Sequence, residues 1–449
     1  MAKVITRFPP SPTGYFHIGS ARTALFNYLF TAREGGVMYL RFEDTDRERC
    51  KKEFEEDIIA GLDWLKIPYT SAVPLRQSER LSTYREYLRA LIEKGAAYEA
   101  EEAEGGNGST SLTTKGRVVR FKNPNTRITF NDLIRGDVSF DTTELKDFVI
   151  ARNVDDPLYH MAVVADDHDM GVTHVIRGED HISNTPRQIL ILEALGFERP
   201  VYAHIPLIHA PDRSKLSKRH GAVSINEYRS DGYLPEALVN YLALLGWTPP
   251  SGREKMPLAD MVAEFDLKDV HAGGAIFDIE KLRWLNRQYI LEMPDERIQA
   301  EIELRIPEKN SGIAAKLVSL VRERIHLWGD IDAMAKGGEF DYFFSDPALD
   351  ISKVPGKGSD AATARRHLAR LRELLSALPS LGNLEPEQIK KAIWDYAEAE
   401  GRGNVLWPLR YALTGKERSP DPFTVAAIIG RDSIERRIET AISALENRS

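Results

Sequence analysis

A loop that joins a predicted strand to a predicted helix constrains this chain more than any other feature. Val4 to Phe8 has the apolar pattern of a short buried strand, and the prolines that follow exclude a helix until Ile18. His17 and Gly19 therefore lie at a predicted helix N-terminus, where unpaired amides and the helix dipole favour an anion. The loop predicts phosphate binding: Gly19 lets a ligand approach the backbone, and His17 donates to a phosphate oxygen. A proline-rich turn whose histidine only caps the helix is the alternative.

A basic segment far downstream supports phosphate binding. Lys215-Leu216-Ser217-Lys218-Arg219 follows a predicted buried strand, Val201 to His209, and a turn at 210–213. Alone, this segment is typical of a basic surface loop. Together with His17-Ile18-Gly19-Ser20 it resembles the paired signatures of class I aminoacyl-tRNA synthetases. The resemblance implies an ATP-binding site made by Gly19, Asp180 and the three catalytic residues His17, Lys215 and Lys218.

Further segments narrow the resemblance to one family. They are, in order, Phe8-Pro9-Pro10-Ser11-Pro12-Thr13-Gly14, Arg41-Phe42-Glu43-Asp44-Thr45-Asp46, Arg76-Gln77-Ser78-Glu79-Arg80, His174-Val175-Ile176-Arg177-Gly178-Glu179-Asp180, Lys281-Leu282-Arg283-Trp284-Leu285-Asn286 and Pro408-Leu409-Arg410-Tyr411-Ala412-Leu413-Thr414-Gly415. Over most of its length the chain resembles a bacterial-type glutamyl-tRNA synthetase. This resemblance implies an α/β fold: a Rossmann-like nucleotide-binding domain of the class I synthetase type with an inserted α+β acceptor-binding domain, followed by all-helical C-terminal anticodon-binding domains.

The resemblance also predicts the domain boundaries. The catalytic domain is expected in two halves, 1–77 and 148–212, on either side of the insertion at 78–147. A stem-contact region that begins with the second signature is expected at 213–294, and the anticodon-binding region at 295–449. Helical patterns fill the last range, which resembles the bacterial glutamyl enzyme and differs from the β-barrels of eukaryotic-type glutaminyl enzymes.

Length and composition agree with several soluble domains. The chain has 449 residues, of which 42% are hydrophobic, enough for more than one core. It has no apolar run long enough to span a membrane and no signal-peptide core at its start, which predicts a cytoplasmic protein. The net charge of −8 requires that basic and acidic faces be segregated if tRNA is the partner. We expect a monomer.

Carboxylates follow the second predicted strand, Val37 to Phe42, at the end where open α/β sheets bind ligands. By resemblance Glu43 receives the α-ammonium group of the substrate; capping of the next helix is the alternative. Tyr159 matches a tyrosine that contacts the substrate. Val163 stands where some relatives have an asparagine in the same pocket, so that polar contact is not expected here.

Arg7 and Arg177 each lie at the end of a predicted strand. The protein must distinguish glutamate from glutamine by the charge of the substrate's side chain, because the two amino acids have nearly the same shape. By resemblance Arg7, helped by Ser11 and Tyr159, binds the side-chain carboxylate, and Arg177 binds the α-carboxylate or the adenosine. The division between the two arginines is a hypothesis.

No metal held by the protein is expected. Cys50 is the only cysteine, so neither an intrachain disulfide nor a cysteine-cluster zinc site can form. Some relatives carry zinc in a longer version of the segment 99–114, which here is short, acidic and rich in glycine and serine and predicts a flexible linker. Histidines and aspartates around a predicted strand, Met161 to Ala165, lack the spacing of metal ligands. Mg²⁺ is expected only with ATP.

The resemblance implies the partners ATP, L-glutamate and tRNA(Glu). Glutamate would attack the α-phosphorus of ATP, and the resulting adenylate would esterify the terminal adenosine of tRNA. Three alternatives stay open: charging of tRNA(Gln) or formation of glutaminyl-tRNA, a tRNA-binding paralogue without turnover, and the truncated relative that glutamylates a modified tRNA base. The intact His17, Lys215 and Lys218 argue against the second alternative, and the helical C-terminal region argues against the third.

Overall fold

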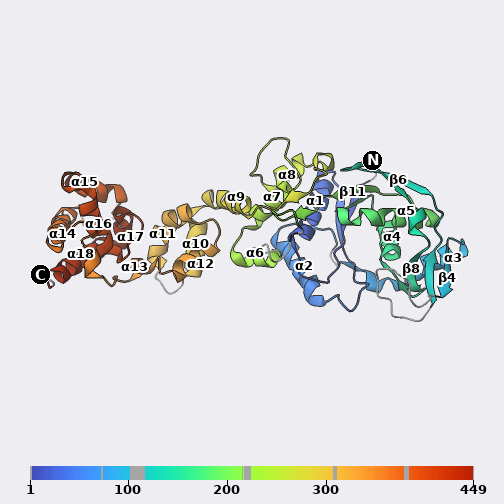
Figure 1. Cartoon of the computed structure of the whole chain (residues 1–449), viewed down its shortest axis with the longest axis horizontal. Coiled ribbons are helices and arrows are strands. Elements are labelled where there is room, and N and C mark those ends of the chain that lie inside the picture. The colour runs from blue at the N-terminus through green and yellow to red at the C-terminus, as the bar shows by residue number, and fades with distance from the viewer. Residues whose placement is uncertain are drawn as a thin grey trace. The chain divides into compact units, whose positions relative to one another are not determined.

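The computed structural model forms two compact units, residues 1–288 and 289–449 (Figure 1). It describes residues 3–71, 74–101, 117–214, 216, 224–306, 311–378 and 384–447. Lys215, Lys218 and most of the predicted linker at 99–114 lie outside these ranges. No helix within them is both long and apolar enough to cross a membrane. The finer predicted boundaries at 77, 147 and 212 stay predictions.

Parallel strands form the centre of the first unit. β1 (Ile5–Phe8), β2 (Val37–Phe42) and β3 (Leu75–Arg76) pair in parallel, as do β10 (His174–Gly178) and β11 (Val201–Ile205). Thr173 links the two sets: its amide donates to the Ile5 carbonyl at 2.9 Å, and its hydroxyl accepts from the Ile5 amide at 2.9 Å. These five strands are called the catalytic sheet below. It confirms the first two predicted strands and the expected α/β class of the first unit.

Helices follow the strands of the first unit. Those of the first half are α1 (Ile18–Arg33), α2 (Lys52–Trp64), α3 (Leu81–Glu93), α4 (Tyr159–Asp169) and α5 (Thr185–Leu195). After the short strand β12 (Ile208–His209), the unit continues with α6 (Ile225–Asp231), α7 (Pro235–Leu244), α8 (Leu258–Glu264), the short strand β13 (Ala275–Ile276) and α9 (Ile279–Leu291).

The inserted strands lie in two different sheets. β4 (Ala97–Glu101), β5 (Arg117–Phe121), β8 (Phe148–Asn153) and β9 (Asp156–Pro157) form an antiparallel sheet. The hairpin of β6 (Arg127–Asp132) and β7 (Gly136–Asp141) instead joins the catalytic sheet, where Asp132 pairs with Tyr202 of β11. The sequence also predicts that the range 148–212 returns to the catalytic sheet with a strand from Phe148 to Arg152, and this is wrong because that strand pairs with β5.

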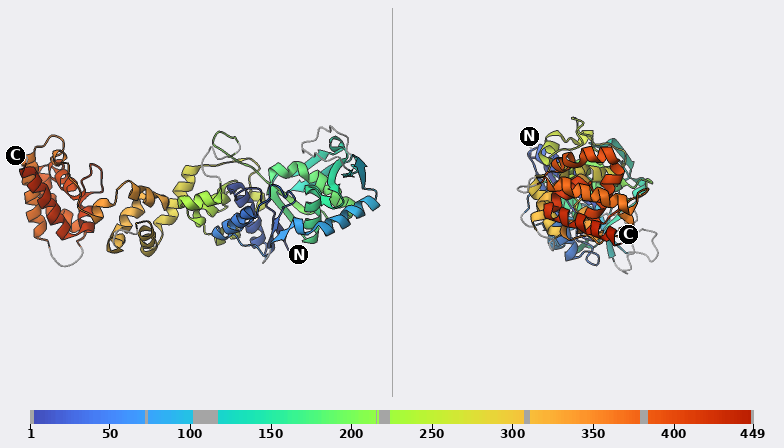
Figure 2. Two further views of the ribbon diagram at one scale, coloured as in Figure 1. Left: turned by 90° about the horizontal axis from the view of Figure 1, so that it is seen from below. Right: turned by 90° about the vertical axis from the view of Figure 1, so that its left-hand side faces the viewer.

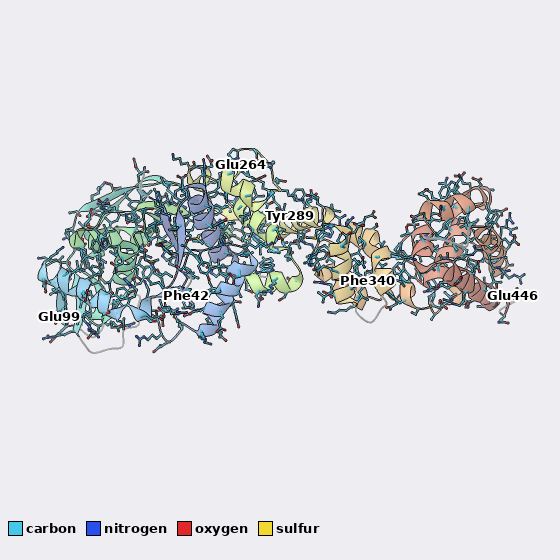
Figure 3. All side chains as sticks on the ribbon, turned by 180° about the vertical axis from the view of Figure 1, so that it is seen from behind. Phe42, Glu99, Glu264, Tyr289, Phe340 and Glu446 are labelled. Carbon is cyan, nitrogen blue, oxygen red and sulfur yellow. The ribbon has the colours of Figure 1, made fainter. Side chains whose placement is uncertain are left out.

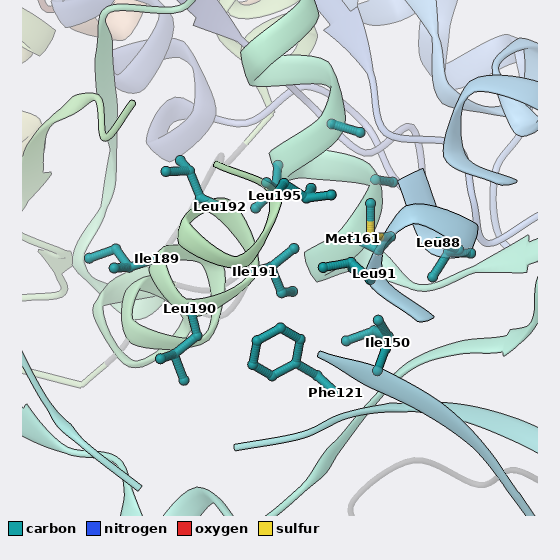
Figure 4. Packing of buried hydrophobic residues seen from close by; sticks show 14 of the residues in the cluster. Leu88, Leu91, Phe121, Ile150, Met161, Ile189, Leu190, Ile191, Leu192 and Leu195 are labelled. Carbon is teal, nitrogen blue, oxygen red and sulfur yellow. The ribbon is translucent and has the colours of Figure 1, made fainter. Parts of the chain in front are cut away.

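The predicted strand Met161 to Ala165 is also wrong, because these residues form the middle of α4. A short apolar run of this kind suits either a buried strand or a helix that is covered on several sides. Every residue from Met161 to Asp167 is buried. Figure 4 shows why: Met161 packs in a core that α4 shares with α3, α5 and the antiparallel sheet, among Leu88, Leu91, Phe121, Ile150 and Ile191.

The second unit is helical throughout its described residues, as predicted for the anticodon-binding region (Figure 2). Side chains of the unit cap several helices; Asp421, for example, accepts from the amides of Phe423 at 3.0 Å and Thr424 at 2.9 Å to begin α17. Its helices are α10 (Asp295–Arg305), α11 (Ser311–Arg324), α12 (Gly329–Lys336), α13 (Asp341–Phe344), α14 (Ala361–Ser376), α15 (Pro386–Glu400), α16 (Arg402–Thr414), α17 (Pro422–Ile429) and α18 (Arg431–Glu446).

Candidate active site

Three predicted substrate residues lie at the carboxyl ends of strands in the catalytic sheet. Arg7 is near the end of β1, Glu43 directly follows Phe42 at the end of β2 (Figure 3), and Arg177 is near the end of β10. All three side chains are buried. Ligands of open α/β sheets bind at this edge, so the fold places these residues where an amino acid and a nucleotide can meet.

An alternating chain of charges connects Arg7 to Glu43. Nε of Arg7 donates to Oδ1 of Asp167 at 3.0 Å, and Nη1 of Arg41 donates to the same oxygen at 2.6 Å. Nη2 of Arg41 then donates to Oε1 of Glu43 at 3.0 Å. Nη1 of Arg7 is buried and makes no hydrogen bond to the described residues. A buried guanidinium nitrogen without an acceptor is costly, so Arg7 is ready to bind an anionic group.

Burial and these neighbours shift the pKa values of the carboxylates in opposite directions. Burial would raise the pKa of Asp167, but Arg7 and Arg41 hold it below its ordinary value. Burial does raise the pKa of Glu43, even though Arg41 and Arg7 oppose the shift. Glu43 is therefore the carboxylate that would gain most from a cationic ligand such as an ammonium group.

Tyr159, the first residue of α4, belongs to the same group of side chains. Its hydroxyl lies 3.1 Å from Nδ1 of His181. Burial raises the pKa of Tyr159 to about 12; the charge of Glu43 adds to the shift, while Arg177 and Arg7 oppose it. The phenol is thus within electrostatic reach of all three strand-end residues, so the structure brings together Arg7, Glu43, Tyr159 and Arg177.

Arg177 lies in a polar cradle that the sequence did not reveal. Its Nη1 donates to Oε1 of Gln188 at 2.8 Å, its Nη2 to Oγ1 of Thr185 at 2.7 Å, and its Nε to Nε2 of His204 at 3.2 Å. Burial lowers the pKa of Arg177, and Arg7 contributes to the shift. Of the five N–H donors of a guanidinium, these bonds use one on each nitrogen, which leaves two for a ligand.

The first signature loop has the predicted geometry. His17 is the N-cap of α1, where its Nδ1 accepts the amide of Ser20 at 3.3 Å and its Nε2 lies 3.0 Å from the Ser20 hydroxyl. A Cβ atom on Gly19 would lie 3.1 Å from the His17 ring. Gly19 therefore gives the imidazole room at the helix N-terminus, which complements its predicted role in letting a ligand approach.

Backbone pairing ties the first signature loop to Ser224 and Ile225, which follow the second signature in sequence. His17 forms an isolated antiparallel bridge with Ser224, which is the N-cap of α6 and lies just beyond the second signature. The amide of Ile225 donates to the carbonyl of Phe16 at 2.7 Å. The amide of Phe16 in turn donates to Oδ2 of Asp57 at 2.7 Å, which fixes the loop to α2. Ser224 and Ile225 thus lie against the first signature loop.

The other predicted site residues are more exposed. Ser11 is exposed in the first loop. The Asp180 side chain is 57% exposed, and its carboxylate lies 3.9 Å from Nε2 of His181. Near Glu43, Asp44 accepts the amide of Ser78 at 2.8 Å, so this neighbouring carboxylate has the structural role of a turn cap.

Metal ligation finds no support in the described part of the chain, where no group of three His, Cys, Asp or Glu side chains could hold an ion. The two aspartates of the suspected cluster bind arginines instead: Asp167 pairs with Arg7, and Oδ1 of Asp166 accepts from Nε of Arg80 at 2.7 Å. The expected absence of zinc stays a prediction, because the segment 102–116 lies outside the described residues.

A cavity of about 980 Å³ lies within the second unit, lined by α11, α15, α17 and the segments around residues 338 and 418. Lysines and arginines are matched there by the same number of carboxylates. The charged lining residues are Lys316, Arg324, Lys416, Arg418, Glu323, Glu339, Glu385 and Asp421. This balance indicates no preference for an anionic or a cationic ligand.

The fold and the family models define a class I tRNA synthetase. Residues 3–105 and 108–284 match the family model of the catalytic domain of class I tRNA synthetases (E and Q). Residues 280–442 match the family model of an anticodon binding domain.

Full-length relatives narrow the class to one family. The glutamate–tRNA ligase of Nitratidesulfovibrio vulgaris is 39% identical over 473 residues, which cover 99% of this chain and 100% of the relative. That of Aquifex aeolicus is 40% identical and covers 99% and 100%. A crystal structure of the glutamate tRNA ligase from Elizabethkingia meningosepticum, in complex with its amino acid, has a TM-score of 0.87 at 33% identity and covers 99% and 100%. The chain belongs to the glutamate–tRNA ligase family.

Proposed function

We propose that the protein activates L-glutamate with ATP and transfers it to the 3′ end of tRNA(Glu). The convergence of Arg7, Glu43, Tyr159 and Arg177 at the strand ends supports this assignment most directly. These side chains offer two cationic groups, one anionic group and a phenol. This set complements the two carboxylates and the ammonium group of glutamate.

Each substrate group has a candidate partner. Arg7 binds the side-chain carboxylate through the nitrogen that lacks an acceptor, and Ser11 and Tyr159 assist it. Arg177 binds the α-carboxylate with the N–H groups that its cradle leaves unused. Glu43 accepts from the α-ammonium. Positioning both reactants in this way supplies much of the catalysis, because it makes the attack effectively intramolecular.

ATP binds at the first loop and the second signature. His17, Gly19 and the N-terminus of α1 face the phosphates, Asp180 contributes near the adenosine, and Lys215 and Lys218 complete the site. An α-carboxylate oxygen of glutamate attacks the α-phosphorus, the bond to diphosphate breaks, and diphosphate leaves. Stabilising the charge on this pentavalent phosphorus is the main catalytic task, and no protein nucleophile is required. The terminal ribose hydroxyl of tRNA then attacks the adenylate carbonyl and AMP leaves.

Mg²⁺ would enter with ATP. This ion keeps most of its waters and is bound mainly by substrate phosphates with one or two carboxylates, so it needs no closed protein cage. When bound, the ion neutralises phosphate charge. The helical second unit binds the anticodon, and the cytoplasmic location and monomeric state stay predictions from the sequence.

Charging purified tRNA tests the proposal. With ATP and Mg²⁺, the protein should attach glutamate to tRNA(Glu) and should not attach glutamine. Efficient charging of tRNA(Gln) with glutamate would show that the enzyme accepts a broader set of tRNAs. Absence of any glutamylated tRNA would contradict the proposal, and glutamate that stays on the tRNA after the 3′-terminal adenosine is removed would indicate base modification.

Elemental analysis tests the expectation for zinc. We expect the purified protein to carry no stoichiometric zinc, because Cys50 is its only cysteine and the segment 99–114 is short and rich in glycine and serine. Activity should persist after dialysis against a chelator once Mg²⁺ is restored. One zinc ion per chain that survives this dialysis would contradict the expectation.

The pH dependence of glutamate use tests Glu43. Burial raises its pKa above the ordinary 4.5, and only the ionised carboxylate can bind the α-ammonium. We therefore expect kcat/KM for glutamate to be constant at higher pH and to fall as the pH drops through the raised pKa. Glu43→Gln should lower kcat/KM at neutral pH and remove this acid limb. If kcat/KM falls in both proteins only near the pKa of free glutamate, about 4.3, then the titration of Glu43 does not control binding.

A further inference from the structure

Asp132 is a buried carboxylate that the insertion contributes to the catalytic sheet. It is the last residue of β6, pairs with Tyr202 of β11 and is 1% exposed. Its Oδ1 accepts the amides of Ile134 and Arg135, each at 3.0 Å. These bonds to the hairpin turn fix the orientation of the carboxylate.

The same carboxylate faces the ring of His204, which is fully buried on β11. Nδ1 of His204 lies 2.6 Å from Oδ2 of Asp132. On the other side of the ring, Nε2 lies 3.2 Å from Nε of Arg177 and 3.1 Å from Oγ1 of Thr185. His204 thus stands between the insertion and the arginine of the amino-acid pocket.

The donors and acceptors in this row determine the ring tautomer. Burial would raise the pKa of Asp132, but His204 and the backbone amides hold it below its ordinary value. An ionised carboxylate only accepts, so Nδ1 of His204 must carry the proton. Nε of Arg177 donates to Nε2, which therefore carries no proton, so the ring is neutral; in agreement, burial lowers the pKa of His204 although the bond to Asp132 opposes the shift. Its Nε2 is then a lone-pair acceptor for the N–H of Arg177.

We infer that Asp132 is a positioning residue for the amino-acid pocket, because it fixes the tautomer of His204 that holds the guanidinium of Arg177. The inference rests on the proposed role of Arg177 in binding the α-carboxylate of glutamate. The insertion then has a second role besides binding tRNA, since one of its side chains helps to shape the pocket for the amino acid.

Asp132→Asn tests the inference with almost no change in shape. The asparagine amide can donate to Nδ1, which would move the ring proton to Nε2 and set one N–H donor against another at Arg177. We expect KM for glutamate in pyrophosphate exchange with tRNA(Glu) to rise about 10- to 100-fold, the usual effect of an unsatisfied buried donor. KM for ATP should stay within about twofold.

A matched control lies in the same hairpin. Asp137 of β7 is exposed and accepts from Asn131 at 2.9 Å. Asp137→Asn should leave KM for glutamate unchanged. An equal rise in both variants, or a rise in KM for ATP equal to that for glutamate, would indicate general damage to the hairpin and overturn the inference.

Nitrogen-15 NMR of the full chain reads the tautomer itself. His204 should be protonated at Nδ1 in the unaltered protein and at Nε2 in Asp132→Asn; its signal is identified by its loss in His204→Gln. Protonation at Nε2 in the unaltered protein would overturn the inference, and this measurement stands even if Asp132→Asn does not fold.

Arg177→Gln separates the inference from the proposed function. If Arg177→Gln raises KM for glutamate and Asp132→Asn does not, Arg177 binds glutamate as proposed, but Asp132 does not position it. If Arg177→Gln itself leaves KM for glutamate unchanged, the proposed role of Arg177 fails, and the inference fails with it.

Discussion

Replacing His17 or Lys218 with alanine is expected to slow formation of glutamyl-adenylate by about 100- to 1,000-fold, the usual effect of removing one preorganised transition-state donor. His17 is the N-cap of α1 and pairs with Ser224, and the proposed function assigns it to the negative charge that develops on the phosphates. The measurement is single-turnover adenylate formation with tRNA(Glu) present. Near-normal rates in both alanine variants would contradict the proposed roles of His17 and Lys218 in adenylate formation.

Two controls separate chemistry from structure in this experiment. His17→Asn keeps a good N-cap residue but loses the imidazole, so it should be slow as well. If His17→Asn restores the normal rate, His17 acts only as a cap. For Lys218, the control is Lys52→Ala on α2, where the side chain is 87% exposed. Lys52→Ala should leave the rate unchanged.

Arg7→Gln is expected to lower kcat/KM for glutamate and to narrow the preference for glutamate over glutamine. A guanidinium that faces the neutral amide of glutamine loses its charge-assisted bond and can meet the N–H donors of the amide. This mismatch costs on the order of 2 to 4 kcal/mol, or about 30- to 1,000-fold. The measurement is pyrophosphate exchange with each amino acid and tRNA(Glu).

The surroundings of Arg7 make this substitution informative. Asp167 keeps its bond from Arg41 at 2.6 Å, so removing the charge of Arg7 does not leave that carboxylate unpaired. Arg80→Gln alters a neighbouring ion pair with Asp166 and should not change the preference. If Arg7→Gln keeps the preference and Arg177→Gln abolishes it, the two arginine roles are reversed. If neither changes it, the pocket has been misplaced.

Local patterns predicted the frame of the site. The prolines before Ile18 exclude a helix, and His17 is indeed the N-cap of α1. The alternation from strand to polar residue at Phe42 and Glu43 placed a carboxylate at the sheet edge, where the structure has it. These features depend on neighbours in sequence, which is why the sequence alone revealed them.

Partners distant in sequence could not be predicted in the same way. Asp132 and His204 are 72 positions apart, and Arg7 and Asp167 are 160 apart, so only the folded sheet brings each pair together. A histidine inside the apolar run of β11 was the one available signal for His204. Asp167 is one of the aspartates beside the predicted strand Met161 to Ala165, and no local pattern indicates its partners, which are arginines on β1 and β2.

Packing also overrode local propensity in two helices. α4 buries an apolar run that suits a strand equally well. α16 contains Pro408, and Gly401 and Gly403 lie at its start, which together disfavour a helix. Buried Val405 and Leu409 nevertheless hold α16 within the second unit. Tertiary contacts, which the sequence pattern does not show, decide both cases.

The bonds between Ile5 and Thr173 also set an order of events on the ribosome. Until Thr173 emerges, the chain must grow by 168 residues after Ile5, which takes roughly 8 to 34 s at typical synthesis rates. During this interval β1 can pair with β2 but has an open edge on its other side, and open strand edges invite pairing with other chains. The nascent protein must therefore make its whole insertion before the central sheet can close, and chaperones have that long to protect it.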